Sequence, residues 1–218
     1  MVTERAEPSL AFERGLVTPG RLVIGMDEVG RGAIAGPVAV GAVAADVWSL
    51  EPLPGVRDSK LLTQRRREAL ADGVRAWGTA RAVGVASPEE VDREGIVVAL
   101  GLAARRALVS LHEAGIAILE ATVLLDGSHD WLSPALSSRP RIVTRVKADR
   151  DCAVVATASV LAKLERDAFM AEADGLHPGY GWSGNKGYGS AGHFAAIGEL
   201  GPSPLHRVTW LRRVVPTG

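Results

Sequence analysis

Four acidic residues stand close to the ends of apolar segments that predict buried strands. They are Asp27, Glu28, Asp126 and Asp149. Because the ends of neighbouring strands meet at one edge of a sheet, we expect these carboxylates to gather there. Four acids in one place repel one another unless a cation offsets their charge. The pattern therefore predicts a metal site.

The ligand types narrow down the metal. Carboxylate oxygens without His or Cys partners favour Mg²⁺ or Mn²⁺ over Zn²⁺, and the five histidines lack metal-like spacing. Acidic side chains that hold two such ions can clamp a phosphodiester, activate the attacking water and neutralise the leaving oxygen. Asp151 is a rival to Asp149 for the fourth ligand, and Asp149 is preferred. The chemistry indicated is metal-dependent cleavage of a phosphodiester.

The pair of Asp27 and Glu28 on its own would more often be a solvated turn after a strand. Neighbouring side chains of a regular strand point to opposite faces, so both enter one site only where the backbone bends. Gly30 and Gly32 supply the conformational freedom for such a bend. The two more distant acids make the site the preferred interpretation.

The elements that must position these acids follow from the hydrophobic pattern. Strands are expected at 21–26, 37–45, 80–86, 121–125 and 141–146, the first three as an antiparallel start to the sheet. Helices are expected at 65–77, from Ser87 to about Leu111 with a break at Gly95, at 153–170 and at 192–200. This order predicts an α/β fold with a mixed sheet covered by helices.

The chain is expected to form one domain over residues 21–214, preceded by a flexible polar leader over residues 1–20. Residues 177–190 are rich in glycine, with aromatic and basic residues between, and predict a shaped loop. Of the five tryptophans, Trp182 is the one considered as a base-stacking residue instead of core packing.

Composition limits the class of protein. The 218 residues hold 25 Lys plus Arg and 25 Asp plus Glu, so no global positive field indicates a nucleic-acid partner. A single cysteine excludes an intrachain disulfide and a multi-cysteine zinc site, and it fits a reducing cytoplasm. No apolar run has the length of a membrane span. A monomer is the default expectation.

Seven short motifs, in order, resemble the ribonuclease HII family over about residues 22–210. They are Asp27 to Gly32 with Ala35 to Pro37, Asp58 to Leu62, Leu125 to Gly127, Asp149, Ala158 to Lys163 with Arg166 and Asp167, Lys186 to Tyr188, and His206 with Arg207. One glycine-rich triplet would be weak evidence, whereas the ordered set is specific.

The resemblance implies a ribonuclease H-like fold with a helical C-terminal addition. It makes Asp27, Glu28, Asp126 and Asp149 the catalytic residues and the ligands of Mg²⁺ or Mn²⁺. It also implies a set of substrate contacts, namely Gly30, Arg31 and Gly32 at the 2′-hydroxyl and adjacent phosphate, Lys60 and Lys186 at phosphates, and Tyr188 against a sugar.

The same resemblance implies an endoribonuclease that hydrolyses the RNA strand of RNA/DNA hybrids. It would also cut 5′ of ribonucleotides embedded in duplex DNA, leaving 5′-phosphate and 3′-hydroxyl ends, as part of ribonucleotide removal during DNA replication and repair. Two alternatives remain open. One is another Mg²⁺-dependent nuclease of the same fold, and the other is a non-catalytic module that binds hybrids.

Overall fold

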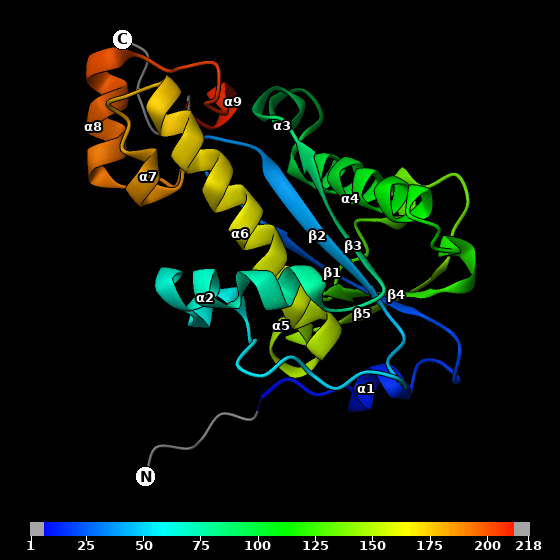
Figure 1. Cartoon of the computed structure of the whole chain (residues 1–218). Helices are drawn as coiled ribbons and strands as arrows, with labels where there is room; N and C mark the ends of the chain where they lie inside the picture. Colours follow the sequence, from blue (N-terminus) through cyan, green and yellow to red (C-terminus); the bar gives the residue numbers. More distant parts are fainter. Residues whose placement is uncertain (1–6, 212–218) are drawn as a thin grey trace.

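The computed structural model describes residues 7–211, which form a five-stranded sheet with helices on both faces (Figure 1). The strands are β1 (Val23–Val29), β2 (Val38–Ala45), β3 (Ala80–Ala86), β4 (Thr122–Asp126) and β5 (Arg141–Arg145), in the order β3-β2-β1-β4-β5. β1 to β3 pair antiparallel, whereas β1, β4 and β5 pair parallel. The mixed sheet and its antiparallel start are confirmed.

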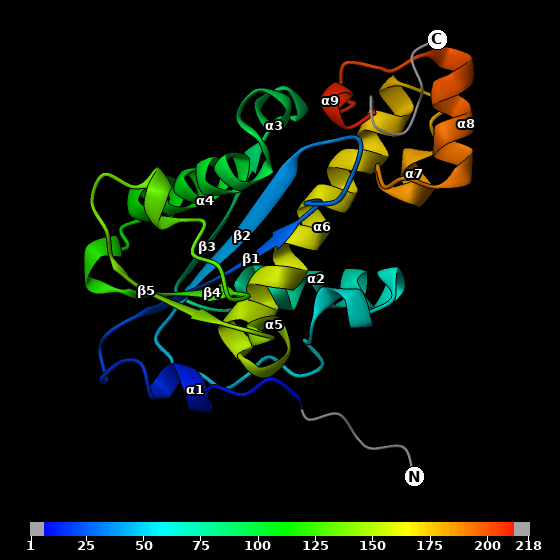
Figure 2. The same ribbon diagram turned by 180° about the vertical axis from the view of Figure 1, so that it is seen from behind.

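Two long helices cover the sheet from opposite sides (Figures 1 and 2). The helices are α1 (Ala11–Arg14), α2 (Gln64–Ala76), α3 (Pro88–Glu94), α4 (Ile96–Glu113), α5 (Ala148–Asp151), α6 (Ala153–Leu176), α7 (Trp182–Asn185), α8 (Ala191–Leu200) and α9 (Val208–Leu211). Three short 3-10 segments are η1 (Ser59–Leu61), η2 (Ile118–Glu120) and η3 (Ser133–Ala135). Across residues 7–211, no helix combines the length and apolar character needed to cross a bilayer.

The boundary between α3 and α4 shows how local sequence fixes an element. The Ser87 hydroxyl accepts a hydrogen bond from the Glu90 N–H, and the Glu90 carboxylate accepts one from the Ser87 N–H. This capping box starts α3 where the sequence predicts it. Gly95 has a φ of 81°, so the chain turns there before α4 begins.

β2 contributes side chains to both hydrophobic cores, one on each face of the sheet. All eight of its residues are buried. Val40 and Ala42 belong to the core under α4, and Val43 belongs to the core under α6. α6 comes so close to the sheet that a Cβ atom at Gly41 would overlap the backbone carbonyl of Ala158. A glycine is therefore required for this contact between helix and sheet.

We expect Gly41→Ala to lower the free energy of unfolding by about 3 kcal/mol, because the clash is with backbone, which cannot rotate away. Gly175→Ala is the control, since Gly175 is exposed near the end of α6 and a Cβ atom there meets nothing within 4 Å. Denaturant unfolding checks both variants. Equal stabilities would show that α6 can move away from β2 at little cost.

The segment before β1 packs against the body of the protein. Leu10 is buried in the core under α6, and Ser9 forms a bridge with Cys152. The buried Glu13 carboxylate accepts the Val154 N–H at 3.0 Å, so it caps the start of α6. Residues 8–20 therefore differ from the flexible leader that we expected. Residues 1–6, and the end of the predicted domain at 212–214, lie outside the described range.

α7, α8 and α9 form a small third cluster at the end of α6 (Figure 2). Trp182 is fully buried there and stacks on Tyr180, with ring centroids 5.0 Å apart. The prediction that Trp182 stacks on a base is therefore wrong, because its indole is buried in this cluster against Tyr180 and His193. The helical C-terminal addition is confirmed.

Two buried histidines in this cluster are held in defined tautomers by backbone groups. The Ser203 N–H donates to Nδ1 of His206 at 2.9 Å, so the proton of His206 is on Nε2. That Nε2 lies 3.1 Å from Nε2 of His193, whose Nδ1 is 2.9 Å from the Tyr188 carbonyl. His193 therefore donates from Nδ1 and accepts at Nε2 from His206 and Trp182. Both rings must be neutral.

We expect acid to loosen this cluster. Burial lowers the pKa of His206 to about 4, below its ordinary value of 6.5, and it also lowers the pKa of His193. The stabilisation from neutral His206 is complete above pH 6.5 and is lost as pH falls toward 4, by up to about 3 kcal/mol.

Urea unfolding at pH 4.5 and 7.5 measures this effect. His206→Asn is the matched control, because its amide oxygen can still accept the Ser203 N–H but does not titrate. The pH dependence should be clearly smaller in the variant. The same slope in both proteins would rule out His206 as its source.

Candidate active site

Asp27 and Asp126 are brought together by strand register. The parallel ladder of β1 and β4 ends with the pair Met26 and Leu125. Asp27 and Asp126 are the next residues of the two strands, so they lie side by side at the carboxyl edge of the sheet. Asp27 is only 3% exposed. The parallel pairing of β1 and β4 therefore brings these two carboxylates together, as the sequence predicts.

Asp149 reaches the same place by a different route from the one expected. β5 ends at Arg145, and Lys147 then adopts a left-handed conformation with a φ of 63°. Asp149 therefore lies in the short helix α5, where its N–H donates to Oδ1 of Asp126 at 3.3 Å. The strand end predicted at residue 146 gives way to a turn that directs Asp149 back toward β4.

Asp151, the alternative to Asp149 as the fourth ligand, pairs with a residue outside the cluster. Asp151 is exposed, and its carboxylate pairs with Arg145 at 3.1 Å. Asp149 is buried, and its carboxylate lies 3.8 Å from Nζ of Lys60. Burial and the contact with Asp126 favour Asp149 over Asp151 as the fourth acid of the cluster.

Glu28 lies on β1 beside Asp27, and the strand stays regularly paired with β2 through Val29. The bend that we expected at the acidic pair therefore comes later, at Gly30, which has a φ of 79°. Glu28 is half-buried, and its carboxylate lies 3.4 Å from the Arg31 guanidinium. Glu28 is therefore more exposed than Asp27, which is buried.

The pKa values of two of the four acids are raised, partly because negative charges lie close together. Burial, together with the charges of Glu28 and Asp126, raises the pKa of Asp27 to about 8 against the lowering effects of the Ser159 hydroxyl and Lys60. Burial and the charge of Asp126 also raise the pKa of Asp149 to about 6. The protein groups alone thus leave the cluster short of positive charge.

One cation faces the cluster from the η1 segment. Burial opposes the charge of Lys60, but the surrounding carboxylates outweigh it and raise the Lys60 pKa. Asp58 caps η1 by accepting the Lys60 N–H at 2.9 Å, and the buried hydroxyl oxygens of Ser159 and Ser59 lie 3.0 Å apart. Sequence reasoning assigned no role to Ser59 or Ser159, whose contact joins segments 100 residues apart.

The donor set fits a hard divalent cation, since it consists of carboxylate oxygens with unbalanced charge. Over residues 7–211, however, no three Asp, Glu, His or Cys side chains converge closely enough to hold one ion as they stand. The structure therefore places Asp27, Asp126 and Asp149 as neighbours at one sheet edge, with Glu28 next to Asp27 on the regular strand β1, and does not arrange the four acids as a finished coordination shell.

The residues that we expect to contact substrate differ in how exposed they are to solvent. Arg31 and Gly32 are exposed on the turn after β1, and Tyr188 is 38% exposed with its ring 5.5 Å from Cζ of Arg166. Lys60 is exposed beside the acids. Lys186 is only 8% exposed and borders a cavity between α2 and α6, so it offers little surface to a phosphate.

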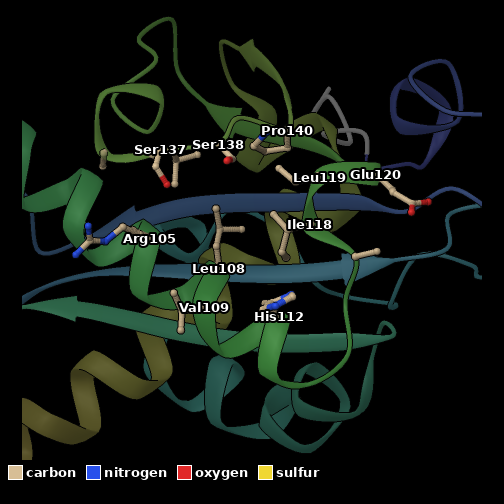
Figure 3. A pocket seen from close by; sticks show the side chains of 13 residues that line it. Arg105, Leu108, Val109, His112, Ile118, Leu119, Glu120, Ser137, Ser138 and Pro140 are labelled. Carbon is tan, nitrogen blue, oxygen red and sulfur yellow. The ribbon is translucent and has the colours of Figure 1, made fainter.

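A larger cavity, of about 670 Å³, lies away from the acids between α4 and the segments 117–120 and 135–140 (Figure 3). Leu108 and Val109 on α4 face Ile118 and Leu119 across it. Its lining is mainly aliphatic and includes none of the four carboxylates. It is therefore separate from the candidate active site.

Comparison with known proteins agrees with the motifs. The family model described as Ribonuclease HII matches residues 24–213. A ribonuclease HII of Streptomyces avermitilis is 45% identical over 205 residues, which cover 93% of this chain and 83% of the relative.

Solved structures give the same fold. The RNase HII in the complex with PCNA from Archaeoglobus fulgidus is 26% identical, with a TM-score of 0.67 over 87% of this chain and 95% of that one. Bst-RNase HIII in complex with Mn²⁺ is 24% identical, with a TM-score of 0.62 over 87% of this chain and 67% of that one. The ribonuclease H-like fold is thus confirmed, and the chain belongs to the ribonuclease HII family and is a ribonuclease H, a hydrolase.

Proposed function

We propose that this protein hydrolyses the RNA strand of RNA/DNA hybrids and cuts 5′ of ribonucleotides embedded in duplex DNA, leaving 5′-phosphate and 3′-hydroxyl ends. Asp27, Glu28, Asp126 and Asp149 hold Mg²⁺ or Mn²⁺ in this proposal. The observation that carries it is the register of β1 and β4, which sets Asp27 beside Asp126 with the Asp149 amide bonded to Asp126. The Mn²⁺ bound to the related RNase HIII supports the type of ion.

The ions, when bound, supply positive charge at the phosphodiester and lower the pKa of the attacking water. The protein contributes a rigid floor, since Asp27 is buried on β1 between two strands that pair along their length. Lys60 contributes an exposed cation at the rim, where a phosphate could approach. Tyr188 contributes an exposed aromatic face to a neighbouring sugar.

Specificity for ribose comes, in this proposal, from the turn formed by Gly30, Arg31 and Gly32. A backbone without side chains at two of its three positions can approach a sugar closely, and its N–H groups can bond to the 2′-hydroxyl and the phosphate. We further propose that the protein acts as a monomer in the cytoplasm, which fits the single buried Cys152.

The test of the activity compares three duplexes of one sequence: all-DNA, RNA/DNA hybrid, and DNA with a single ribonucleotide. We expect Mg²⁺ or Mn²⁺ to support cleavage of the two ribose-bearing duplexes and not of the all-DNA duplex. The product 5′ ends should accept ligation without added kinase. Cleavage of the all-DNA duplex at a similar rate would instead favour a general nuclease, and tight binding without cleavage would favour a non-catalytic module.

The ligand assignment is tested by two isosteric variants two residues apart. Asp149→Asn should lower kcat by about 100-fold or more, because a charge that offsets the bound cation is worth several kcal/mol. Asp151→Asn should stay within about 3-fold of wild type, because Asp151 is exposed and paired with Arg145. Reversed results would make Asp151 the ligand.

Asp126→Asn should likewise abolish cleavage and leave duplex binding mostly intact, as gel-shift measurements without divalent ions would show. Cleavage at the wild-type rate with the usual metal requirement would remove Asp126 from the catalytic set.

A further inference from the structure

Two fully buried arginines lie under the turn after β1. Arg166, on α6, is 2% exposed, and Arg207, just before α9, is 0% exposed. Within residues 7–211, neither forms a salt bridge with a carboxylate. A buried cation without an anion is costly unless hydrogen bonds use its donors. The bonds that these two guanidinium groups make are therefore informative.

Arg207 donates to the carbonyl oxygens of the turn. Its Nη2 lies 2.7 Å from the Gly30 oxygen, and its Nη1 lies 3.0 Å from the Arg31 oxygen. Nη2 also lies 3.1 Å from the Gly36 oxygen. One planar group thus holds the Gly30 and Arg31 carbonyls of the turn, together with the Gly36 carbonyl farther along the chain, facing the guanidinium.

Those inward carbonyls fix the direction of the amide groups. In a trans peptide the C=O of one residue and the N–H of the next point in opposite directions. Because the Gly30 and Arg31 carbonyls point at Arg207, the N–H groups of Arg31 and Gly32 point away from it. In the described part of the chain, no hydrogen bond uses either of these N–H groups.

Arg166 joins the same turn to the loop of Tyr188. It donates to the Pro37, Ala35 and Lys186 carbonyls at 2.9, 3.1 and 2.8 Å. Its side chain is so close to Gly30 that a Cβ atom there would overlap it. Gly30 is therefore a glycine because the arginine needs the space, as well as because its φ is positive.

We propose that Arg207, braced by Arg166, is a positioning residue that directs the N–H groups of Arg31 and Gly32 toward the ribose and phosphate of the substrate. This inference rests on the proposed function, since it takes a ribose-bearing duplex as the ligand. A merely structural role would stabilise the fold without changing the preference for ribose. The two roles can be separated.

The variant is Arg207→Lys, which keeps the charge but cannot donate to three carbonyls in a plane. We expect kcat/KM on the single-ribonucleotide duplex to fall by about 10-fold to 100-fold, since two aligned donors are lost. Binding of the matched all-DNA duplex should stay within about 3-fold. In Arg207→Ala, added guanidinium should restore part of the cleavage.

Arg14→Lys is the matched control. Arg14 also donates to backbone carbonyls, those of Val47 and Leu50 at 2.8 and 3.0 Å, but in a different part of the molecule. It should lower the melting temperature and leave kcat/KM unchanged. Equal losses of cleavage in the two lysine variants, following their melting temperatures, would overturn the positioning role.

A second measurement needs no variant and so does not depend on its folding. Amide exchange of the wild-type protein, followed by NMR in EDTA, should slow at Arg31 and Gly32 with the single-ribonucleotide duplex and not with the all-DNA duplex. Unchanged exchange at both amides would contradict the inference. Wild-type protein that cuts no ribose-bearing duplex would refute the proposed function itself, whereas normal cutting by Arg207→Lys would refute only the role of Arg207.

Discussion

Repulsion between carboxylates at one edge of a sheet is the constraint to which the rest of this structure is adapted. Asp27 is buried next to Asp126, and Asp149 is bonded to Asp126 through its amide. Neighbouring like charges at low exposure oppose folding unless cations or hydrogen-bond donors offset them. A site of this kind needs a stiff scaffold and a cation.

The scaffold is stiff because both faces of the central strands are covered. α4 packs on one face and α6 on the other. α6 is in close contact with the sheet at Gly41, which is the partner of Asp27 in the neighbouring strand. Lys60, on η1, places its ammonium group 3.8 Å from the Asp149 carboxylate. On the far side of the β1 turn, the buried Arg166 and Arg207 donate hydrogen bonds to backbone carbonyls of the turn and of the segment after it.

Local signals were sufficient for most elements. The apolar run 80–86 matches β3 residue for residue, and the Ser87 cap and Gly95 break occur where the sequence places them. These features depend on hydrogen bonds and burial within a few residues, which a sequence displays directly. The expectation that Asp27 and Asp126 lie close together rested on their places near strand ends, and the parallel register of β1 and β4 explains why that part of the prediction is met.

The features that sequence reasoning missed depend on contacts between distant residues. Glu13 caps α6 from 141 residues away, so the segment around it looked like a loose leader. Arg207 donates to the Gly30 carbonyl across 177 residues, so the sequence marked it as part of a motif without showing this contact. Asp149 lies in α5 because Lys147 adopts a left-handed backbone conformation. The sequence gives no sign of this, since a lysine rarely has a positive φ.

Thermal unfolding of wild type and Asp126→Asn, in EDTA and with increasing Mg²⁺, tests the charge constraint most directly. We expect Asp126→Asn to melt at a higher temperature than wild type in EDTA, because one repelling charge is gone. We also expect Mg²⁺ to raise the melting temperature of wild type and to have little effect on the variant, because only an ion bound to the folded state stabilises it. A variant less stable than wild type in EDTA, or a wild-type melting temperature that Mg²⁺ does not change, would contradict it.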